Sequence, residues 1–200
     1  MDTGVQRDAE GGVILSNVDI VAAIDAGDLA IEPLYGRDPT APPFNTSAVD
    51  LRLGTTILVP KADDPISHRL HLSYSADYIG RNADAHEITS DRPFTLRRDR
   101  FVLARTAERV SLPIRPGRPA YAARVEGKSS RARLGMLVHF TAPTIHAGFS
   151  GCVTLEIINL GAANIDLVPG VFICQLVVER VSGLPVAVAN NFSGQASPAG

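Results

Sequence analysis

Short apolar stretches that alternate with polar residues recur along the chain from residue 48 to residue 181. Gly, Pro, Asn and Asp separate these stretches, a pattern typical of short strands joined by turns. The stretches are VDLRLGTTILV, RPFTLRRDRFVLARTAERVSL, AYAARVEG, GCVTLEIINL and NIDLVPGVFICQLVVERV. They predict a mainly β, mostly antiparallel fold of the jelly-roll or distorted β-barrel type, with a few short helices.

Two helices are expected outside these strands. Ser16 is a candidate N-cap for a helix over residues 17–26, Asp19 completes a short capping box, and Gly27 is a C-terminal stop. A shorter helix is expected over residues 129–134. Between the helices, the proline-rich residues 39–44 (PTAPPF) predict a rigid extended linker. The polar residues 61–92 predict a solvated insertion or loop, since their His, Asp and Glu residues fit no compact metal-ligand motif.

One acidic residue interrupts the strand predicted over residues 152–158. Because side chains alternate across a strand, Leu155 and Ile157 are expected on one face and Glu156 on the other. A carboxylate among apolar strand residues needs either a partner or a chemical role. The structural alternative is a strand acid that pairs with an arginine such as Arg133.

Residues 127–130 read Gly-Lys-Ser-Ser at the start of the short predicted helix. Helix N-termini leave backbone N–H groups unpaired and carry partial positive charge, so Lys128, Ser129 and Ser130 form a candidate phosphate cradle. The alternative is a serine N-cap on an ordinary surface helix.

Composition favours one folded domain over residues 1–200 with a small-molecule partner. The chain is 45% hydrophobic with a formal net charge of -2, which gives no basic surface for nucleic acid. No apolar run of about 18 residues is present to span a membrane. Residues 1–12 are polar and glycine-rich, so we expect a flexible N-terminus without a secretion signal and a cytoplasmic protein. Residues 184–200 are expected to form a C-terminal tail or lid.

Several motifs in order resemble the dCTP deaminase branch of the trimeric dUTPase-like family. EGKSSRARLG and VHFTAPTIHAGFSGCVTLEIIN are similar to the family pattern EGRSSxARLG, then Thr-Ala, then IDPGWxGxxxLE. ILSNVDIVAAIDAGDLAIEP resembles the family's opening helix, SAVDLRLG its first core strand and FVLARTAERVSLP the strand before the active segment. The likeness covers roughly residues 13–180 and implies a dUTPase-like fold and a homotrimer with sites between subunits.

The resemblance implies hydrolytic deamination of dCTP to dUTP and ammonia. Glu156 matches the family's essential glutamate, which acts as general base and then as general acid. Ser129 and Arg133 are implied to position the water and the carboxylate, and the backbone carbonyl of Ala142 to contact the exocyclic amine. Arg133 lies four residues after Ser129, which places both on one side of a helix.

This chemistry is expected to proceed without zinc. Zinc-dependent nucleobase deaminases carry H-x-E and P-C-x-x-C signatures, and the sequence contains neither. Cys152 and Cys174 are the only cysteines, and both are expected to be buried structural thiols.

The resemblance also implies how the nucleotide is held. Lys128 and Ser130 would bind the phosphates, with Mg²⁺ coordinated mainly by phosphate oxygens and water. Gln175 matches a glutamine near the phosphates, although a satisfied sheet residue is the alternative. Phe149 stands where an aromatic ring packs beneath the sugar and excludes a 2′-hydroxyl, although a core phenylalanine at a hairpin turn is the alternative.

Two positions depart from the family pattern. His146 replaces an Asp that contacts the 3′-hydroxyl and, in dUTPases, orients the attacking water, so deamination should survive this change better than triphosphate hydrolysis. In the tail, Phe192 and Gln195 match a KYxGQ-like lid segment in part, and Asn191 replaces its lysine. The alternatives are therefore a dUTPase or bifunctional enzyme, and a non-catalytic nucleotide-binding regulator. dTTP is a further candidate ligand, as an inhibitor.

Overall fold

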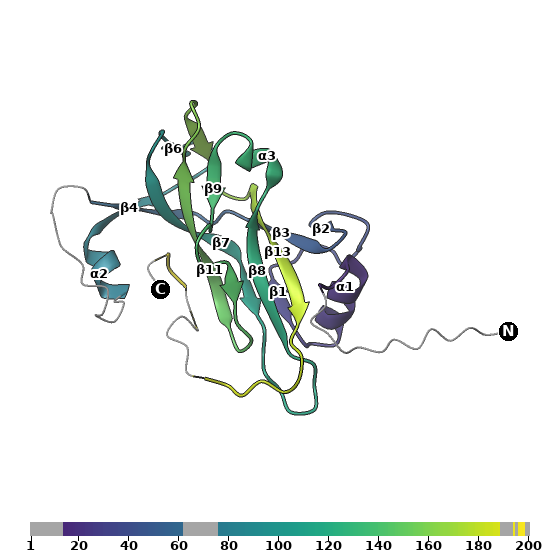
Figure 1. The fold of residues 1–200 in the computed structure, drawn as a ribbon. Coiled ribbons are helices and arrows are strands. Elements are labelled where there is room, and N and C mark those ends of the chain that lie inside the picture. The colour runs from purple at the N-terminus through teal and green to yellow at the C-terminus, as the bar shows by residue number, and fades with distance from the viewer. Residues whose placement is uncertain (1–13, 62–75, 189–193, 195, 199–200) are drawn as a thin grey trace.

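The structure is a computed structural model that describes residues 14–61, 76–188, 194 and 196–198 of the 200-residue chain. Two antiparallel sheets dominate the described residues (Figure 1), and buried side chains from both of them form the main hydrophobic core. Helices are short and few among these residues, so the predicted mainly β fold is confirmed. The longest described helix has nine residues, and no helix in the described part of the chain is long and apolar enough to cross a membrane.

The strand pairings within the described residues define three sheets. The larger sheet has six strands in the order β5 (Ala83–Glu87), β4 (Thr56–Pro60), β7 (Phe101–Ser111), β11 (Ser150–Asn159), β9 (Met136–Val138), with β1 (Ala30–Glu32) also paired to β7. The second sheet has five, in the order β10 (Thr144–Ile145), β8 (Tyr121–Gly127), β13 (Phe172–Arg180), β3 (Ala48–Arg52), β2 (Phe44–Asn45). The third pairs β12 (Ile165–Leu167) with β6 (Phe94–Leu96).

Helix α1 (Asn17–Asp25) forms as its capping residues predict. The Ser16 hydroxyl accepts a hydrogen bond from the Asp19 N–H and donates one to the Asp19 carboxylate, at 3.2 and 2.8 Å. Gly27 follows with a φ of 73°, a left-handed conformation that glycine adopts without steric cost. The buried face of the helix, which includes Ile20 and Ile24, belongs to the main core.

The structure corrects the expectation of a loop over residues 61–92. Residues 62–75 lie outside the described residues, but α2 (Ala76–Arg81) and strand β5 follow them. Beside α2, a second, small core forms on the face of the larger sheet opposite to the main core, where Leu58, Ala83 and Leu103 are buried together. The sequence of β5 shows almost no alternation of apolar and polar residues, and only one of its residues is buried. The strand therefore depends on its backbone pairing with β4.

The expected extended linker over residues 39–44 is also wrong. The chain makes consecutive turns there, with hydrogen bonds from the Ala41 N–H to the Asp38 carbonyl and from the Phe44 N–H to the Ala41 carbonyl, each 3.1 Å. The Pro42–Pro43 peptide bond is cis, a geometry that suits tight turns rather than extended chain.

Candidate active site

Glu156 lies on the face of β11 that points away from the main core. The residues of β11 alternate between buried and half-buried, and Leu155 and Ile157 are completely buried. This alternation confirms the predicted faces of the strand. The Glu156 side chain is 28% exposed, so part of it can reach a ligand.

His139, which sequence reasoning did not single out, is the direct neighbour of Glu156. It follows β9, whose pairing of Val138 with Ile157 brings residues 139 and 156 opposite each other. The His139 N–H donates to the Glu156 backbone carbonyl at 2.7 Å, and His139 Nδ1 lies 2.9 Å from Glu156 Oε2. The Glu156 carboxylate therefore contacts a histidine that follows the adjacent strand and not Arg133, as the structural alternative supposed.

A β-bulge in β7 connects β11, the strand of Glu156, with the backbone of the buried residue Glu108. Between Arg105 and Arg109, β7 advances four residues while β11 advances two. The Thr106 hydroxyl fills the bulge, because it accepts a hydrogen bond from the Val153 N–H at 2.9 Å and donates one to the Glu108 carbonyl at 2.7 Å. Bulges of this kind redirect side chains next to functional sites.

The two cysteines have different environments. Cys174 is fully buried in β13, and burial raises the pKa of its thiol, as expected for a structural residue. Cys152 is only half-buried, and its Sγ lies 3.3 Å from Nη1 of Arg105, which corrects the expectation that both thiols are buried. No three His, Cys, Asp or Glu side chains of the described residues are grouped to hold a metal ion.

Helix α3 (Ser129–Ala132) begins at the predicted residue and is shorter than expected. Lys128 is its N-cap, and no side chain bonds the first N–H groups, so the alternative of a serine cap is wrong. Ser129, Ser130 and Arg133 are exposed to solvent. The Arg133 N–H donates to the Ser129 carbonyl at 3.1 Å, which keeps these two residues on one side of the turn.

Lys128 folds back onto the second sheet. Its Nζ lies 2.5 Å from Oδ2 of Asp50 and 5.8 Å from the centre of the Phe172 ring. Asp50 also accepts a hydrogen bond from Asn45 at 2.9 Å, and it stands opposite Gln175 in the pairing of β3 with β13. Because directly opposed residues share a face of the sheet, Lys128, Asp50 and Gln175 form one polar cluster.

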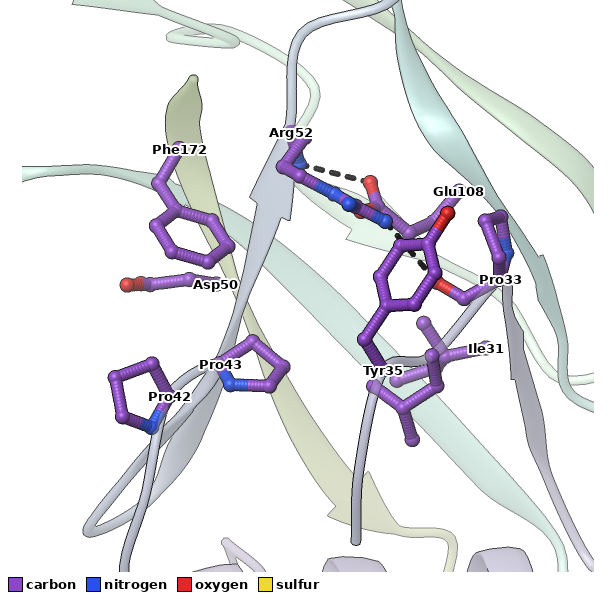
Figure 2. A pocket seen from close by; sticks show the side chains of 10 residues that line it. Ile31, Pro33, Tyr35, Pro42, Pro43, Asp50, Arg52, Glu108 and Phe172 are labelled. Atoms are coloured by element: carbon purple, nitrogen blue, oxygen red, sulfur yellow. Dashed lines mark hydrogen bonds and ion pairs between the residues drawn. The ribbon is translucent and has the colours of Figure 1, made fainter. Parts of the chain in front are cut away.

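A pocket adjoins this cluster and shares Asp50 and Phe172 with it (Figure 2). Figure 2 shows Arg52 at its upper edge, where the guanidinium bonds Glu108 and lies 4.5 Å from the centre of the Tyr35 ring. Proline rings and the aliphatic side chain of Ile31 form the remaining wall. Asp50, Tyr35 and Arg52 were not among the predicted site residues, because charged and aromatic residues in and near a strand do not signal a pocket by their spacing.

The turn between β10 and β11, two strands of different sheets, and the segment before it hold the remaining predicted contacts. Ala142 and His146 are exposed, whereas Phe149 is buried and packs into the main core. The turn closes through Gly148, whose φ is 91° and whose N–H donates to the Leu112 carbonyl at 2.6 Å. Phe149 thus has the core position that was its structural alternative, and its contact with a sugar remains a prediction.

Gly194 of the C-terminal tail lies next to this turn. The Gly194 N–H donates to the Ser150 carbonyl at 2.6 Å, which places residue 194 next to the start of β11. Phe192 and Gln195, the predicted lid residues, lie outside the described residues.

Two groups that contain predicted site residues therefore form within one chain. Lys128 contacts Asp50, which stands opposite Gln175 in the sheet, and Glu156 contacts His139. Among the described residues, no hydrogen bond or ion pair joins Glu156 to Ser129 or Arg133.

Comparison with known proteins identifies the family. The family model described as dCTP deaminase-like matches residues 14–181, so the chain belongs to the dCTP deaminase-like family. A Dictyoglomus thermophilum protein named "dCTP deaminase, dUMP-forming" is 36% identical over 170 residues, which cover 85% of this chain and 81% of that protein. A Halorubrum lacusprofundi protein named "dCTP deaminase" is also 36% identical, over 82% of this chain and 76% of its own length.

A solved structure shows the same fold. The crystal structure of 2′-deoxycytidine 5′-triphosphate deaminase from Agrobacterium tumefaciens superimposes with a TM-score of 0.64 at 19% sequence identity. The match covers 86% of this chain and 49% of the Agrobacterium chain, so the chain spans about half the length of that protein. The predicted fold class is confirmed.

Proposed function

We propose that this protein hydrolyses the exocyclic amine of dCTP, giving dUTP and ammonia, with Glu156 as general base and general acid. The observation that carries the proposal is the placement of Glu156. Its carboxylate is confined on the half-buried face of β11 in a chain of the dCTP deaminase-like family. The names of the relatives support the substrate.

One carboxylate can perform all the proton transfers that the reaction needs. Glu156 takes a proton from the attacking water as its oxygen bonds to C4 of cytosine, and passes that proton to ring N3. The second proton of the water then goes to the departing amine, so that dCTP and water become dUTP and ammonia. Ser129 and Arg133 would orient the water and the carboxylate, and the Ala142 carbonyl would accept a hydrogen bond from the amine.

The nucleotide phosphates would bind at the cluster of Lys128 and Gln175, together with the exposed Ser130. Lys128 would then exchange part of its contact with Asp50 for the phosphate oxygens. Mg²⁺ would arrive with the triphosphate, held mainly by phosphate oxygens and water. No step in this scheme requires zinc, because the carboxylate itself activates the water.

The separation of the two groups supports sites that are shared between subunits of a homotrimer. Ser129 and Arg133 are exposed on α3, where a second copy can reach them. Large apolar side chains are also exposed near α3 and β9: Leu134, Phe140 and Leu160, at 55, 46 and 50%. Exposed apolar groups of this size favour contact with another protein surface.

The second candidate is a bifunctional enzyme that releases dUMP, because some relatives carry the name "dUMP-forming". His146 argues against it, since a neutral imidazole has one acceptor nitrogen and cannot replace a carboxylate in both tasks, contact with the 3′-hydroxyl and orientation of the water that attacks phosphorus. The neutral ring can still accept one hydrogen bond from the 3′-hydroxyl.

The test is a nucleotide panel with Mg²⁺, followed by ammonia measurement and product mass spectrometry. We expect ammonia and dUTP from dCTP, with activity retained in a zinc-selective chelator. Glu156→Gln should abolish turnover and leave dCTP binding within about threefold, because it removes the proton carrier and keeps the shape. Pyrophosphate and dUMP would instead establish the bifunctional enzyme. Binding without turnover by the wild type would overturn the proposal in favour of a regulator.

A further inference from the structure

His139 has an unusual combination of burial, charge and backbone conformation. The residue is 8% exposed, and its side chain lies within 2.9 Å of the Glu156 carboxylate. Neither ring nitrogen has an aligned hydrogen bond to a described residue, and Glu156 Oε2 is likewise buried without one. Buried polar atoms without aligned partners are rare and costly, so this pair is not explained by stability.

The contact defines where a proton lies. A nitrogen without hydrogen and a carboxylate oxygen both carry negative partial charge and would repel each other at 2.9 Å, so we assign a hydrogen to Nδ1. In the present geometry the N–H is not aligned with Oε2, and the attraction is mainly that of charge and dipole. A rotation of the ring or the carboxylate would complete the hydrogen bond when the site closes on a ligand.

The backbone at His139 also favours a role for its side chain. Its φ is 54°, and Asp99, with a φ of 57°, is the other described non-glycine residue with a positive φ. Asp99 is exposed in the turn before β7, where an aspartate tolerates this conformation. Histidine also tolerates this conformation better than most residues, but at His139 it occurs at a buried position, and uncommon backbone conformations of this kind cluster at functional sites.

We propose that His139 is a positioning residue for the general base: Nδ1 holds Oε2 of Glu156 and leaves Oε1 to work on the water and the pyrimidine. This inference rests on the proposed deamination. Glu156 must face a substrate atom with one defined oxygen, and a glutamate side chain with three rotatable bonds does not hold such a geometry by itself. The cross-strand neighbour restrains it at the carboxylate, where restraint matters most.

Substitutions at position 139 separate positioning from packing. His139→Leu introduces an apolar side chain of similar bulk and removes the donor, and we expect kcat to fall about a hundredfold with KM for dCTP within about threefold. His139→Asn places an amide N–H near the position of Nδ1 and tolerates positive φ, so it should recover at least tenfold of that loss. His139→Gly, which suits the backbone, should fold and remain as slow as the leucine variant.

A matched control addresses the backbone. Asp99→Gly relieves the same φ at an exposed turn and should leave kcat and KM unchanged. Wild-type kcat in His139→Leu would overturn the proposal, as would a loss that appears only in KM. If His139→Leu fails to fold, kcat and KM of His139→Gly and His139→Asn test the proposal instead: the glycine variant should be slow and the asparagine variant at least tenfold faster.

A measurement without turnover distinguishes this inference from the deamination proposal. In protein with ¹⁵N-labelled histidine, the His139 ring nitrogens should report a protonated Nδ1, and Glu156→Gln should shift the Nδ1 resonance. Absence of ammonia from dCTP in the wild type would refute deamination. An Nδ1 resonance that is unaffected by Glu156→Gln would refute the contact, whatever the reaction.

Discussion

Lys128 and Asp50 form an ion pair between the N-cap of α3 and strand β3, with Nζ 2.5 Å from Oδ2. Their side chains are 23 and 10% exposed, so the pair is shielded from much of the solvent. The cation proposed to bind phosphate is thus already occupied by a carboxylate of its own chain. A triphosphate must therefore compete with Asp50, and the competition sets the affinity at this end of the site.

Replacement of that carboxylate should strengthen binding of the metal-free nucleotide. Asp50→Asn removes both the competitor of the phosphates and a negative charge close to them, and we expect dCTP in EDTA to bind about tenfold more tightly. Isothermal titration calorimetry at two salt concentrations measures this. Asp84→Asn is the control, because Asp84 is 63% exposed and should change affinity little. Weaker binding by Asp50→Asn would show that Asp50 supports the phosphates rather than competing with them.

Arg52 and Glu108 join the two large sheets through a buried contact. The Glu108 side chain is 4% exposed, and its two oxygens accept hydrogen bonds from Nε and the backbone N–H of Arg52 at 2.6 and 2.8 Å. Glu108→Gln leaves Arg52 without its counter-charge, and we expect the free energy of unfolding in urea to fall by about 3 kcal/mol.

The matched control for this prediction is Glu87→Gln. Glu87 accepts a hydrogen bond from the Thr56 hydroxyl at 2.7 Å on an exposed part of the sheet. Its replacement should change the free energy of unfolding by less than about 0.5 kcal/mol. Equal effects of the two substitutions would contradict a special role for the contact between the sheets.

Cys174 should make the protein less stable at alkaline pH. Burial raises the pKa of its thiol in the folded state, whereas the ordinary value is 9.0. Above pH 9 the unfolded chain therefore releases a proton that the folded protein retains, and stability falls as pH rises, by up to about 1.4 kcal/mol per pH unit. Urea denaturation between pH 8 and 10 measures the slope.

Cys174→Ala should remove most of that slope. Val178→Ala, at a fully buried position of the same strand, is the control: it should lower stability at every pH and leave the slope unchanged. If Cys174→Ala still loses stability steeply at alkaline pH, the loss arises from other groups. Tyr121 is one of these, because burial is the main cause that raises its pKa above 10.0.

The strands were predictable because their periodicity is local. The faces of β11, including that of Glu156, follow from alternation within ten residues. The contact of Glu156 with His139 does not, because it depends on the register between β9 and β11, which no local pattern encodes. For the same reason Asp50 is an ordinary strand acid in the sequence and becomes the partner of Lys128 only when β3 and β8 pair with the two edges of β13.

The segments that were predicted wrongly depend on distant contacts or on peptide geometry. Strand β5 has one buried residue, Ala83, and its backbone pairs with β4. The turns over residues 39–44 include a cis Pro42–Pro43 bond, which composition cannot distinguish from a trans bond in an extended linker. Local propensity therefore predicted the fold class and the strand face of Glu156, but not the residues that surround its side chain.

The C-terminal tail offers the last prediction. Its Gly194 N–H bonds the Ser150 carbonyl at the start of β11, and Pro198 is buried, so the described residues near its end contact the body beside the turn that carries His146 and Phe149. A segment in this position would cover a nucleotide bound at the turn. Leu184, Val186 and Val188, which lie between β13 and this segment, are 82 to 85% exposed and therefore contribute little to the core.

Truncation after Gly183 should therefore leave the melting temperature within a few degrees and raise KM for dCTP about tenfold, because closure over the substrate is lost. Steady-state kinetics and thermal unfolding measure the two effects. Combined Phe192→Ala and Gln195→Ala substitutions in the full-length chain should reproduce the rise in KM if these residues make the closing contacts. Val186→Ser, at an 85% exposed position, should not. An unchanged KM after truncation would mean that the tail lies beside the turn without closing over the substrate.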